Sequence, residues 1–294
     1  MLSPHRVVIA AFPGVEPLNV TGPAEVFSVA TRVAGAARPG YSVRVATPGG
    51  EPVATAGGIR LMADLTLDEV PGNVDTLLVS GAVRVTGHGV EPVVDGAIVD
   101  WLRTAAPGDH RLASVCSGAH LLAAAGLLDG LSATTHWRTA ARLAADHPQV
   151  TVDPDPIFIR EGRLWTCAGI ASGMDMALAM VTEDHGPELA LATARTMVMY
   201  VKRAGGQSQF SVPLALPADP GDRIDDLRVW IGDHLAEDLS ADALAARLHL
   251  SVRHFARLFR RRTGITPAAY VESLHRVFRG RLGTTPAEYR RRFR

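Results

Sequence analysis

Short apolar runs alternate with amphipathic helical patterns over residues 1–200. The runs are rich in Val, Ile and Leu and are bounded by turn residues, which favours buried strands. The expected strands are Arg6–Ala11, Tyr41–Thr47, Thr76–Ser80, Arg111–Val115, Ile157–Arg160 and Leu164–Cys167. The expected helices are Pro23–Ala34, Gly96–Ala106, Gly118–Ala125, Thr139–His147, Gly173–His185 and Glu188–Lys202. Alternation of this kind predicts an α/β layer fold with a mostly parallel sheet.

The pattern changes after residue 203. Residues 204–222, AGGQSQFSVPLALPADPGD, are rich in Gly, Pro, Ser and Gln and show little periodicity, which is typical of a linker. From residue 223 onward the pattern is wholly helical. The expected helices there are Ile224–Leu235, Ala241–Leu248 and Val252–Arg262. The sequence therefore predicts an α/β domain over 1–203, a linker over 204–222 and an all-α domain over 223–294.

The second and third of these C-terminal helices are short and joined by a tight turn. Ser240 and Ser251 stand where each would be capped. Phe255, Leu258 and Phe259 recur at helical spacing and would face a core. A basic second helix after a tight turn is typical of a helix-turn-helix, whose second helix enters the major groove of DNA.

The outward-facing residues of 252–262 are the candidate DNA contacts. Arg253, His254 and Arg257 lie toward the start of the helix and are our candidates for base edges, since Arg suits guanine. Ser251 and Arg261 are our candidates for phosphate contacts. The alternative is an ordinary three-helix domain with solvated arginines.

Charge is unevenly distributed although the formal net charge is zero. Residues 1–222 hold 15 Lys and Arg against 22 Asp and Glu, whereas residues 223–294 hold 15 Arg against 8 Asp and Glu. A basic end on an acidic body fits binding to a polyanion through that end alone.

A sequence motif near the end of the chain occurs twice. Residues 256–270 read ARLFRRRTGITPAAY, and residues 275–289 read HRVFRGRLGTTPAEY. Each copy is an apolar and basic helix, a Gly stop and a Thr-Pro helix start, which is how a helix-turn-helix unit ends. The repeat indicates two such units in the ancestor of this chain.

Residues 225–270 resemble the AraC family of bacterial regulators, as do residues 276–293. The stretch LSADALAARLHLSVRHFARLFRRRTGITPAAYV follows the family's first helix-turn-helix closely. Members of that family have two such units bridged by a long helix. Here the two Thr-Pro signatures are only 19 residues apart, from Pro267 to Pro286. The resemblance therefore implies a shortened bridging helix and a truncated second unit. The residues that the family pattern would have in between are missing near Leu274–His275.

A turn of small residues, LASVCSG, joins the strand ending at Val115 to the helix starting at Gly118. Cys116 at this turn has the setting of a nucleophile elbow, and the helix N-terminus is expected to lower the pKa of its thiol. His136 in ATTHW and Glu25 in TGPAEVF are residue types that serve a thiol nucleophile as base and orienter. The alternative is a buried turn cysteine near a hydrogen-bonded histidine.

The first domain resembles the PfpI-like superfamily, also called class I glutamine amidotransferase-like. The resemblance is carried by FPGVEPLNVTGPAEVF, VCSGAHLLAAAGLLDG, ATTHW and AGIASGMDMAL. It implies that the elbow residue Cys116 pairs with Glu25 from the first helix. A PfpI-like domain followed by an AraC module resembles the GlxA group of transcriptional regulators, as does the linker phrase GGQSQFSVPL at 205–214.

Asn19 departs from the isocyanide hydratase-like members, which carry an Asp in this N-terminal loop. An amide is not a general base, so the departure argues against that reaction. In regulators of this kind, the resemblance implies that the same pocket binds a small effector, of an amino-acid-like or quaternary-ammonium class. The candidate pocket residues are Glu25, Cys116, His136 and Asn19.

Other features exclude several classes of protein. Cys116 and Cys167 are too few for a disulfide framework, and Cys167 is expected to be a core residue. The histidines have no metal-ligand spacing, and the Gly pairs match no phosphate-binding fingerprint, so neither a metal nor a cofactor is predicted. No apolar run reaches about 18 residues, and the start, HRVVIAAF, has no signal-peptide pattern. We therefore expect a cytoplasmic protein with no membrane span.

These expectations combine into a regulator. A flavodoxin-like α/β sandwich would sense a small metabolite, and the helical domain would bind double-stranded DNA. A homodimer would supply a second half-site. One alternative is a cysteine-dependent hydrolase or isocyanide hydratase-like enzyme with a vestigial DNA-binding tail. Another is a regulator that acts only in heterodimers with an intact paralogue.

Overall fold

In a computed structural model the chain forms two compact units, with the boundary between Ser208 and Gln209. The structure describes residues 3–87, 89–105, 108, 110–200, 206–207, 223–235, 237–282, 284–285 and 288. Most of the predicted linker 204–222, and much of the tail in which the truncated second unit is expected, lie outside the described residues. Gly206 and Gln207, which the sequence assigns to the linker, belong to the first unit.

A seven-stranded sheet forms the centre of the first unit, in the order β12-β13-β9-β6-β1-β2-β5. Its strands are β1 (His5–Ala10), β2 (Tyr41–Thr47), β5 (Leu65–Thr66), β6 (Thr76–Val79), β9 (Arg111–Val115), β12 (Phe158–Glu161) and β13 (Leu164–Cys167). Every neighbouring pair is parallel except β12 with β13, which confirms the predicted mostly parallel sheet. Three small sheets pair β3 (Val53–Ala54) with β4 (Arg60–Leu61), β7 (Val83–Thr86) with β8 (Gly89–Pro92), and β10 (Ser132–Ala133) with β11 (Thr151–Val152).

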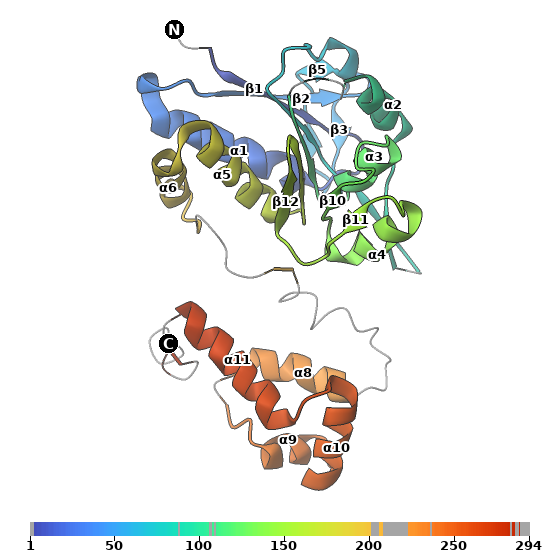
Figure 1. The fold of residues 1–294 in the computed structure, drawn as a ribbon, viewed down its shortest axis with the longest axis vertical. Coiled ribbons are helices and arrows are strands. Elements are labelled where there is room, and N and C mark those ends of the chain that lie inside the picture. Colours follow the sequence, from blue (N-terminus) through green and yellow to red (C-terminus); the bar gives the residue numbers. More distant parts are fainter. Residues whose placement is uncertain are drawn as a thin grey trace. The chain divides into compact units, whose positions relative to one another are not determined.

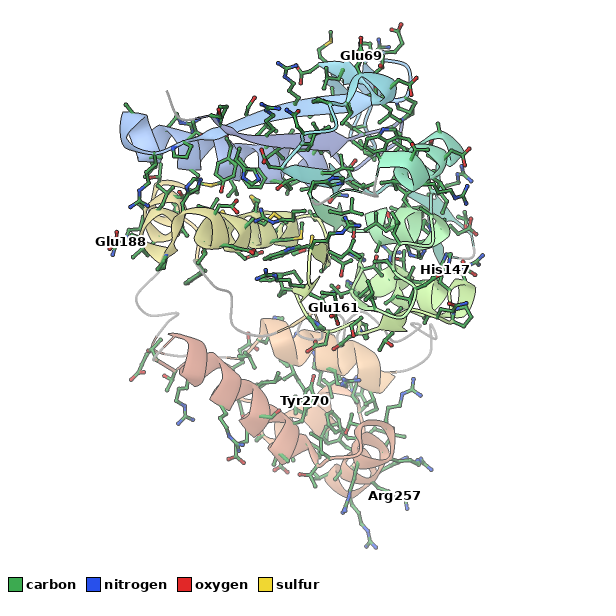
Figure 2. All side chains as sticks on the ribbon, turned by 45° about the horizontal axis from the view of Figure 1, so that its top comes forward. Glu69, His147, Glu161, Glu188, Arg257 and Tyr270 are labelled. Atoms are coloured by element: carbon green, nitrogen blue, oxygen red, sulfur yellow. The ribbon has the colours of Figure 1, made fainter. Side chains whose placement is uncertain are left out.

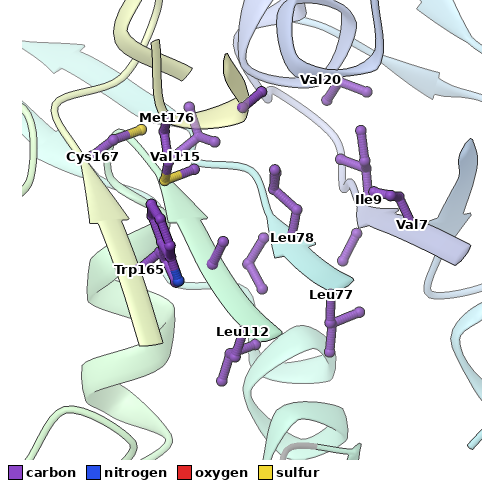
Figure 3. Packing of buried hydrophobic residues seen from close by; sticks show 14 of the residues in the cluster. Val7, Ile9, Val20, Leu77, Leu78, Leu112, Val115, Trp165, Cys167 and Met176 are labelled. Carbon is purple, nitrogen blue, oxygen red and sulfur yellow. The ribbon is translucent and has the colours of Figure 1, made fainter. Parts of the chain in front are cut away.

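Helices cover both faces of the central sheet (Figure 1). One face carries α1 (Pro17–Ala34), α5 (Ser172–His185) and α6 (Pro187–Thr196), and the other carries α2 (Gly96–Ala105), α3 (Gly118–Ala124) and α4 (Trp137–Asp146). Short 3₁₀ turns, η1 (Gly35–Ala37) and η2 (Leu67–Glu69), complete the unit. Strands buried on both faces are rich in apolar residues, and side chains such as Ile9, Leu78 and Leu112 form the core (Figure 3). This is the predicted flavodoxin-like α/β sandwich.

Two helices of this unit differ from their predicted bounds by six residues at one end, and the other predicted helices of the unit differ by at most two. Helix α1 begins at Pro17, whereas the sequence pattern placed the start at Pro23, which lies inside the helix. Either proline suits a first helical turn, so the pattern alone does not choose between them. Helix α6 ends at Thr196 and does not run on to Lys202; the φ of Val198 is +54°, which no helix continues through. Lys202 itself lies outside the described residues.

The second unit is all-α over its described residues. It contains α8 (Arg223–Asp233), α9 (Ala241–Arg247), α10 (Val252–Thr263) and α11 (Pro267–Leu282), and it has its own apolar core around Ile231, Leu244 and Phe255. Helix α11 passes through residue 274 without a break, so the junction inferred from the repeat lies inside one helix. None of the described helices of either unit is long and apolar enough to cross a membrane.

Candidate functional site

Cys116 lies at the sharp turn between β9 and α3. Its φ is +61°, a left-handed conformation that is uncommon for a residue with a side chain. Its N–H donates a 3.1 Å hydrogen bond to the carbonyl of Cys167, and its own carbonyl accepts one of 2.9 Å from the Thr135 hydroxyl. The side chain is 3% exposed. The chain therefore forms a strand-turn-helix elbow that is fixed from two neighbouring segments.

Two glycines leave the space that this elbow needs. A Cβ at Gly169 would lie 2.1 Å from the Cβ of Cys116. A Cβ at Gly81 would lie 2.4 Å from the backbone nitrogen of Gly118 and 2.5 Å from the Ser117 hydroxyl. Because these neighbours include backbone atoms, they have little freedom to move aside. The loops after β6 and β13 thus pack directly against the elbow.

Asn19 connects these two loops. Its side chain is fully buried, its Oδ1 accepts a 2.8 Å hydrogen bond from the N–H of Ile170, and its Nδ2 donates one of 3.1 Å to the carbonyl of Gly81. An ionised carboxylate only accepts hydrogen bonds. An amide is therefore the group that completes this bridge, and an Asp would face the Gly81 carbonyl with a negative charge.

Burial raises the pKa of the Cys116 thiol to about 11. Hydrogen bonds from the Ser117 backbone and from Asn19 lower the pKa, but by less than burial raises it, and the Glu16 carboxylate raises it further. The pKa shift is opposite to the lowering expected from the helix N-terminus, because burial is the largest influence on this thiol and α3 has only seven residues. The thiol is protonated at neutral pH, and the thiol form is a poor nucleophile.

Glu25 lies on the exposed side of α1. Its carboxylate pairs with Arg32 at 3.0 Å, and its side chain is 56% exposed. The predicted pairing of Cys116 with Glu25 is therefore wrong. Because α1 begins at Pro17, the buried stripe of the helix includes Asn19 and leaves Glu25 on the opposite side.

His136 caps α4. Its Nδ1 accepts a 3.3 Å hydrogen bond from the N–H of Arg138, and its ring stacks on Trp137 with 5.6 Å between the ring centroids. Burial lowers the pKa of His136, and the nearby Arg138 charge lowers it further, so the ring is neutral at neutral pH. Within the described residues, no hydrogen bond joins His136 to the Cys116 thiol. The contact with the elbow comes from the preceding residue, Thr135.

Sequence reasoning missed the role of Gln207. Its side chain is 3% exposed, and its Oε1 accepts a 2.9 Å hydrogen bond from the N–H of Trp137. The phrase GGQSQFSVPL that contains it carried a family resemblance, but it gave no indication of a contact with the first unit. The segment 134–137 therefore contacts both Cys116 and Gln207.

Three cavities, of about 390, 270 and 500 Å³, lie near the amino ends of the central strands. Residues such as His5, Asn73 and His110 line them, and none of the three is lined by Asn19, Cys116 or His136. The elbow is at the carboxyl end of β9. Cys116 is 3% exposed, so its side chain is nearly closed off from solvent in this conformation.

Helix α10 is built from a cap and an apolar face. The Ser251 hydroxyl accepts a 3.3 Å hydrogen bond from the N–H of His254, and Gly264 ends the helix with a φ of +78°. Phe255 and Phe259 are fully buried and meet edge to face, with 5.6 Å between their ring centroids. Local sequence therefore fixes which side of α10 faces outward.

The outward side of α10 carries the candidate DNA contacts. Ser251, Arg253, His254, Arg257 and Arg261 are all exposed. Figure 2 shows the Arg257 side chain extending away from its helix into solvent. A row of exposed cationic groups on a capped helix matches the chemistry of phosphates and base edges.

Two family descriptions match the chain. Residues 5–183 match the DJ-1/PfpI family, and residues 231–272 match the bacterial regulatory helix-turn-helix proteins of the AraC family. The first match spans the elbow, Asn19 and His136. The second includes α9 and α10.

Curated relatives include transcriptional regulators and an enzyme. The HTH-type transcriptional regulator GbdR of Pseudomonas aeruginosa (strain UCBPP-PA14) is 29% identical over 222 residues, which cover 75% of this chain and 58% of that protein. The HTH-type transcriptional regulator GlxA of Rhizobium meliloti is 32% identical over 53% of this chain and 46% of its own length. The isonitrile hydratase of Pseudomonas putida is 33% identical over 61% of this chain and 72% of its own length. The chain thus spans less than two thirds of the length of GbdR and of GlxA.

Solved structures share the fold of the first unit. An AraC family transcriptional regulator from Pseudomonas putida has a TM-score of 0.58 at 22% identity, covering 66% of this chain and 100% of that one. Drosophila melanogaster DJ-1beta has a TM-score of 0.55 at 21% identity, covering 68% of this chain and 100% of that one. Similarity at this level of identity concerns the fold alone.

Proposed function

We propose that this chain, which belongs to the DJ-1/PfpI family and carries an AraC-type helix-turn-helix, is a DNA-binding transcriptional regulator. The first unit senses a small metabolite, and the second unit binds double-stranded DNA. Two of its relatives, GbdR and GlxA, are named as regulators of this type.

The observation that carries the proposal is the exposed basic side of α10. Arg253, His254 and Arg257 lie in the first two turns, which in a helix-turn-helix enter the major groove. Arg261 lies further along the same helix, where phosphate contacts set the register of the protein on DNA. The apolar face of α10 is occupied by the core of its own unit, which leaves the basic side for a partner.

The elbow supports sensing better than catalysis. The Cys116 thiol is protonated, Asn19 holds the position of a base but is an amide, and His136 is engaged as a helix cap. A thiol nucleophile needs a base or a lowered pKa, and these residues supply neither. The similarity to isonitrile hydratase keeps an enzymatic alternative, whose test is turnover of an isocyanide that is lost in Cys116→Ser; we expect no such turnover.

The effector belongs to the site around Cys116, Asn19 and His136. An amino-acid-like or quaternary-ammonium metabolite fits the family resemblance. A homodimer would place two copies of α10 on successive half-sites, since each chain matches the AraC description over one segment only. A regulator of this kind acts in the cytoplasm.

The test is fluorescence anisotropy of the whole chain on DNA from its own upstream region, at several salt concentrations, against a scrambled duplex. We expect preference for its own DNA and affinity that falls as salt rises, because phosphate contacts release counterions. Equal and weak binding to both duplexes would overturn the regulator and leave the Cys116 site as the place to seek function.

A further inference from the structure

The carboxamide of Gln207 fills a socket on the first unit. Its Oε1 accepts a 2.9 Å hydrogen bond from the N–H of Trp137. Its Nε2 faces three acceptors, the Thr134 hydroxyl at 3.1 Å, the Thr135 carbonyl at 2.9 Å and the Pro156 carbonyl at 3.2 Å. The side chain is 3% exposed. One donor facing the oxygen and three acceptors facing the nitrogen make this socket specific for an amide.

The backbone next to this side chain is also docked. The N–H of Gln207 donates a 2.6 Å hydrogen bond to the carbonyl of Asp155. A Cβ at Gly206 would lie 2.4 Å from the carboxyl group of Asp155, so a larger residue would displace that side chain. The chain just before the second unit is thus held against the first unit by both backbone and side chain.

The socket shares a wall with the elbow. The Thr135 hydroxyl donates to the carbonyl of Cys116 at 2.9 Å, while the Thr135 carbonyl accepts from Gln207. Trp137, whose N–H holds the Gln207 oxygen, stacks on His136. A displacement of residues 134–137 therefore changes both sites at once.

We propose that Gln207 is a latch that couples the Cys116 site to the linker. Asn19, Thr135 and Cys116 are at most 3% exposed, so a small molecule reaches Cys116 only by moving a wall of the site. Displacement of residues 134–137 removes the Gln207 partners on that wall. Gly206 and Gln207 are then no longer held on the first unit by these side-chain hydrogen bonds. The regulatory meaning of this latch rests on the proposed function, but the coupling between the two sites does not.

The coupling is reciprocal, which allows a test without a known effector. Opening the latch by mutation frees residues 134–137 and makes Cys116 more accessible. We would compare the full chain with Gln207→Glu, which keeps the shape but cannot donate to three acceptors, and with Gln207→Ala, which adds no charge. Gln149→Glu is the matched control, because its side chain is exposed in the same unit.

Two quantities are measured on each protein: hydrogen exchange of the peptide containing the Gln207 amide, and the rate of Cys116 alkylation by iodoacetamide, followed by mass spectrometry. We expect both to rise by about tenfold or more in the Gln207 variants, a loss of about 1.4 kcal/mol or more of local stability. Both should stay unchanged in Gln149→Glu. Exchange in β1 and β9 reports whether the first unit remains folded.

Unchanged exchange at the Gln207 peptide would overturn the latch, and faster exchange with unchanged Cys116 reactivity would overturn the coupling. A reciprocal measurement covers the case in which the variants unfold. In the unmutated chain, a carbamidomethyl group placed on Cys116 should accelerate exchange at the Gln207 peptide, and unchanged exchange there would also overturn the coupling. Anisotropy on the same samples separates the two proposals, because absence of specific DNA binding in every protein overturns the regulator alone.

Discussion

The side-chain oxygen of Asn19 accepts a 2.8 Å hydrogen bond from the backbone N–H of Ile170, which lies 151 residues further along the chain. Ile170 has a φ of +52°, a conformation that a β-branched residue adopts only when its surroundings hold it there. The first turn of α1 thereby fixes the loop after β13 over Cys116. The site is closed by a neutral bridge, and no acid or base occupies that position.

Asn19→Asp should destabilise the first unit at neutral pH. An Asp cannot donate to the Gly81 carbonyl, and burial would raise the pKa of its carboxyl group above the unfolded value. We expect the free energy of unfolding to fall by about 1–3 kcal/mol. The loss should shrink below about pH 4, where the carboxyl is protonated in the folded and the unfolded chain. Denaturant unfolding at both pH values measures this.

The matched control for that substitution is Asn73→Asp, since Asn73 is exposed in the same unit. Its effect should stay within about 0.5 kcal/mol. Equal losses in the two variants would show that the Asn19 bridge does not depend on its amide.

Cys116 should react slowly with iodoacetamide at neutral pH. Because burial raises the pKa of the thiol to about 11, the alkylation rate should climb about tenfold per pH unit toward that value. In guanidinium the rate should level off near the ordinary thiol pKa of about 8.5. The same shift means that the thiol contributes stability below about pH 9, which is lost as the pH rises toward 11. A native rate that levels off below about pH 8 would indicate an activated thiol and favour the enzyme.

Arg257→Ala should weaken binding to the preferred duplex and reduce discrimination against the scrambled one. Loss of an Arg that contacts a base costs about 1–3 kcal/mol, or roughly 5–150-fold in affinity. Arg84→Ala removes the same charge from an exposed position on β7 and should leave the affinity unchanged. Anisotropy titrations that find no difference between the two variants would exclude α10 as the reading helix.

Gly169→Ala should be more costly than Gly130→Ala. Both glycines have positive φ, +96° and +76°. Each substitution therefore costs about 1–2 kcal/mol of stability, because alanine must adopt a left-handed conformation. Nothing lies within 4 Å of a Cβ at Gly130, whereas a Cβ at Gly169 meets Cys116 at 2.1 Å. We expect about 1–3 kcal/mol of additional loss for Gly169→Ala in denaturant unfolding. Equal losses would mean that the elbow moves aside freely.

The sequence predicts well the elements whose pattern is decided locally. The strands Tyr41–Thr47 and Leu164–Cys167 have their predicted bounds, because each is rich in apolar, aromatic and β-branched residues and is ended by turn residues. The caps of α9 and α10 were predicted at Ser240 and Ser251, and each hydroxyl accepts the expected backbone hydrogen bond. A cap requires only residues within the same turn.

The candidate site was harder to predict because it depends on packing between distant segments. Two prolines suit the start of α1, and only the burial of Asn19 against Gly81 and Ile170 selects the earlier one. Gln207 is a polar residue in a stretch rich in Gly and Pro, which reads as solvated linker. Its side-chain partner Trp137 is 70 residues away, a relationship that no local pattern contains.

Helix α10 has 12 residues, so it is about 18 Å long and extends beside about five base-pair steps of DNA. A sequence that short recurs by chance many times in any genome, among about 10⁶–10⁹ competing sites. One copy of this helix therefore contacts too few base pairs to specify a single site in a genome. If a second copy of the chain binds beside the first, as proposed above, the number of base pairs between the two half-sites adds to the sequence that is recognised.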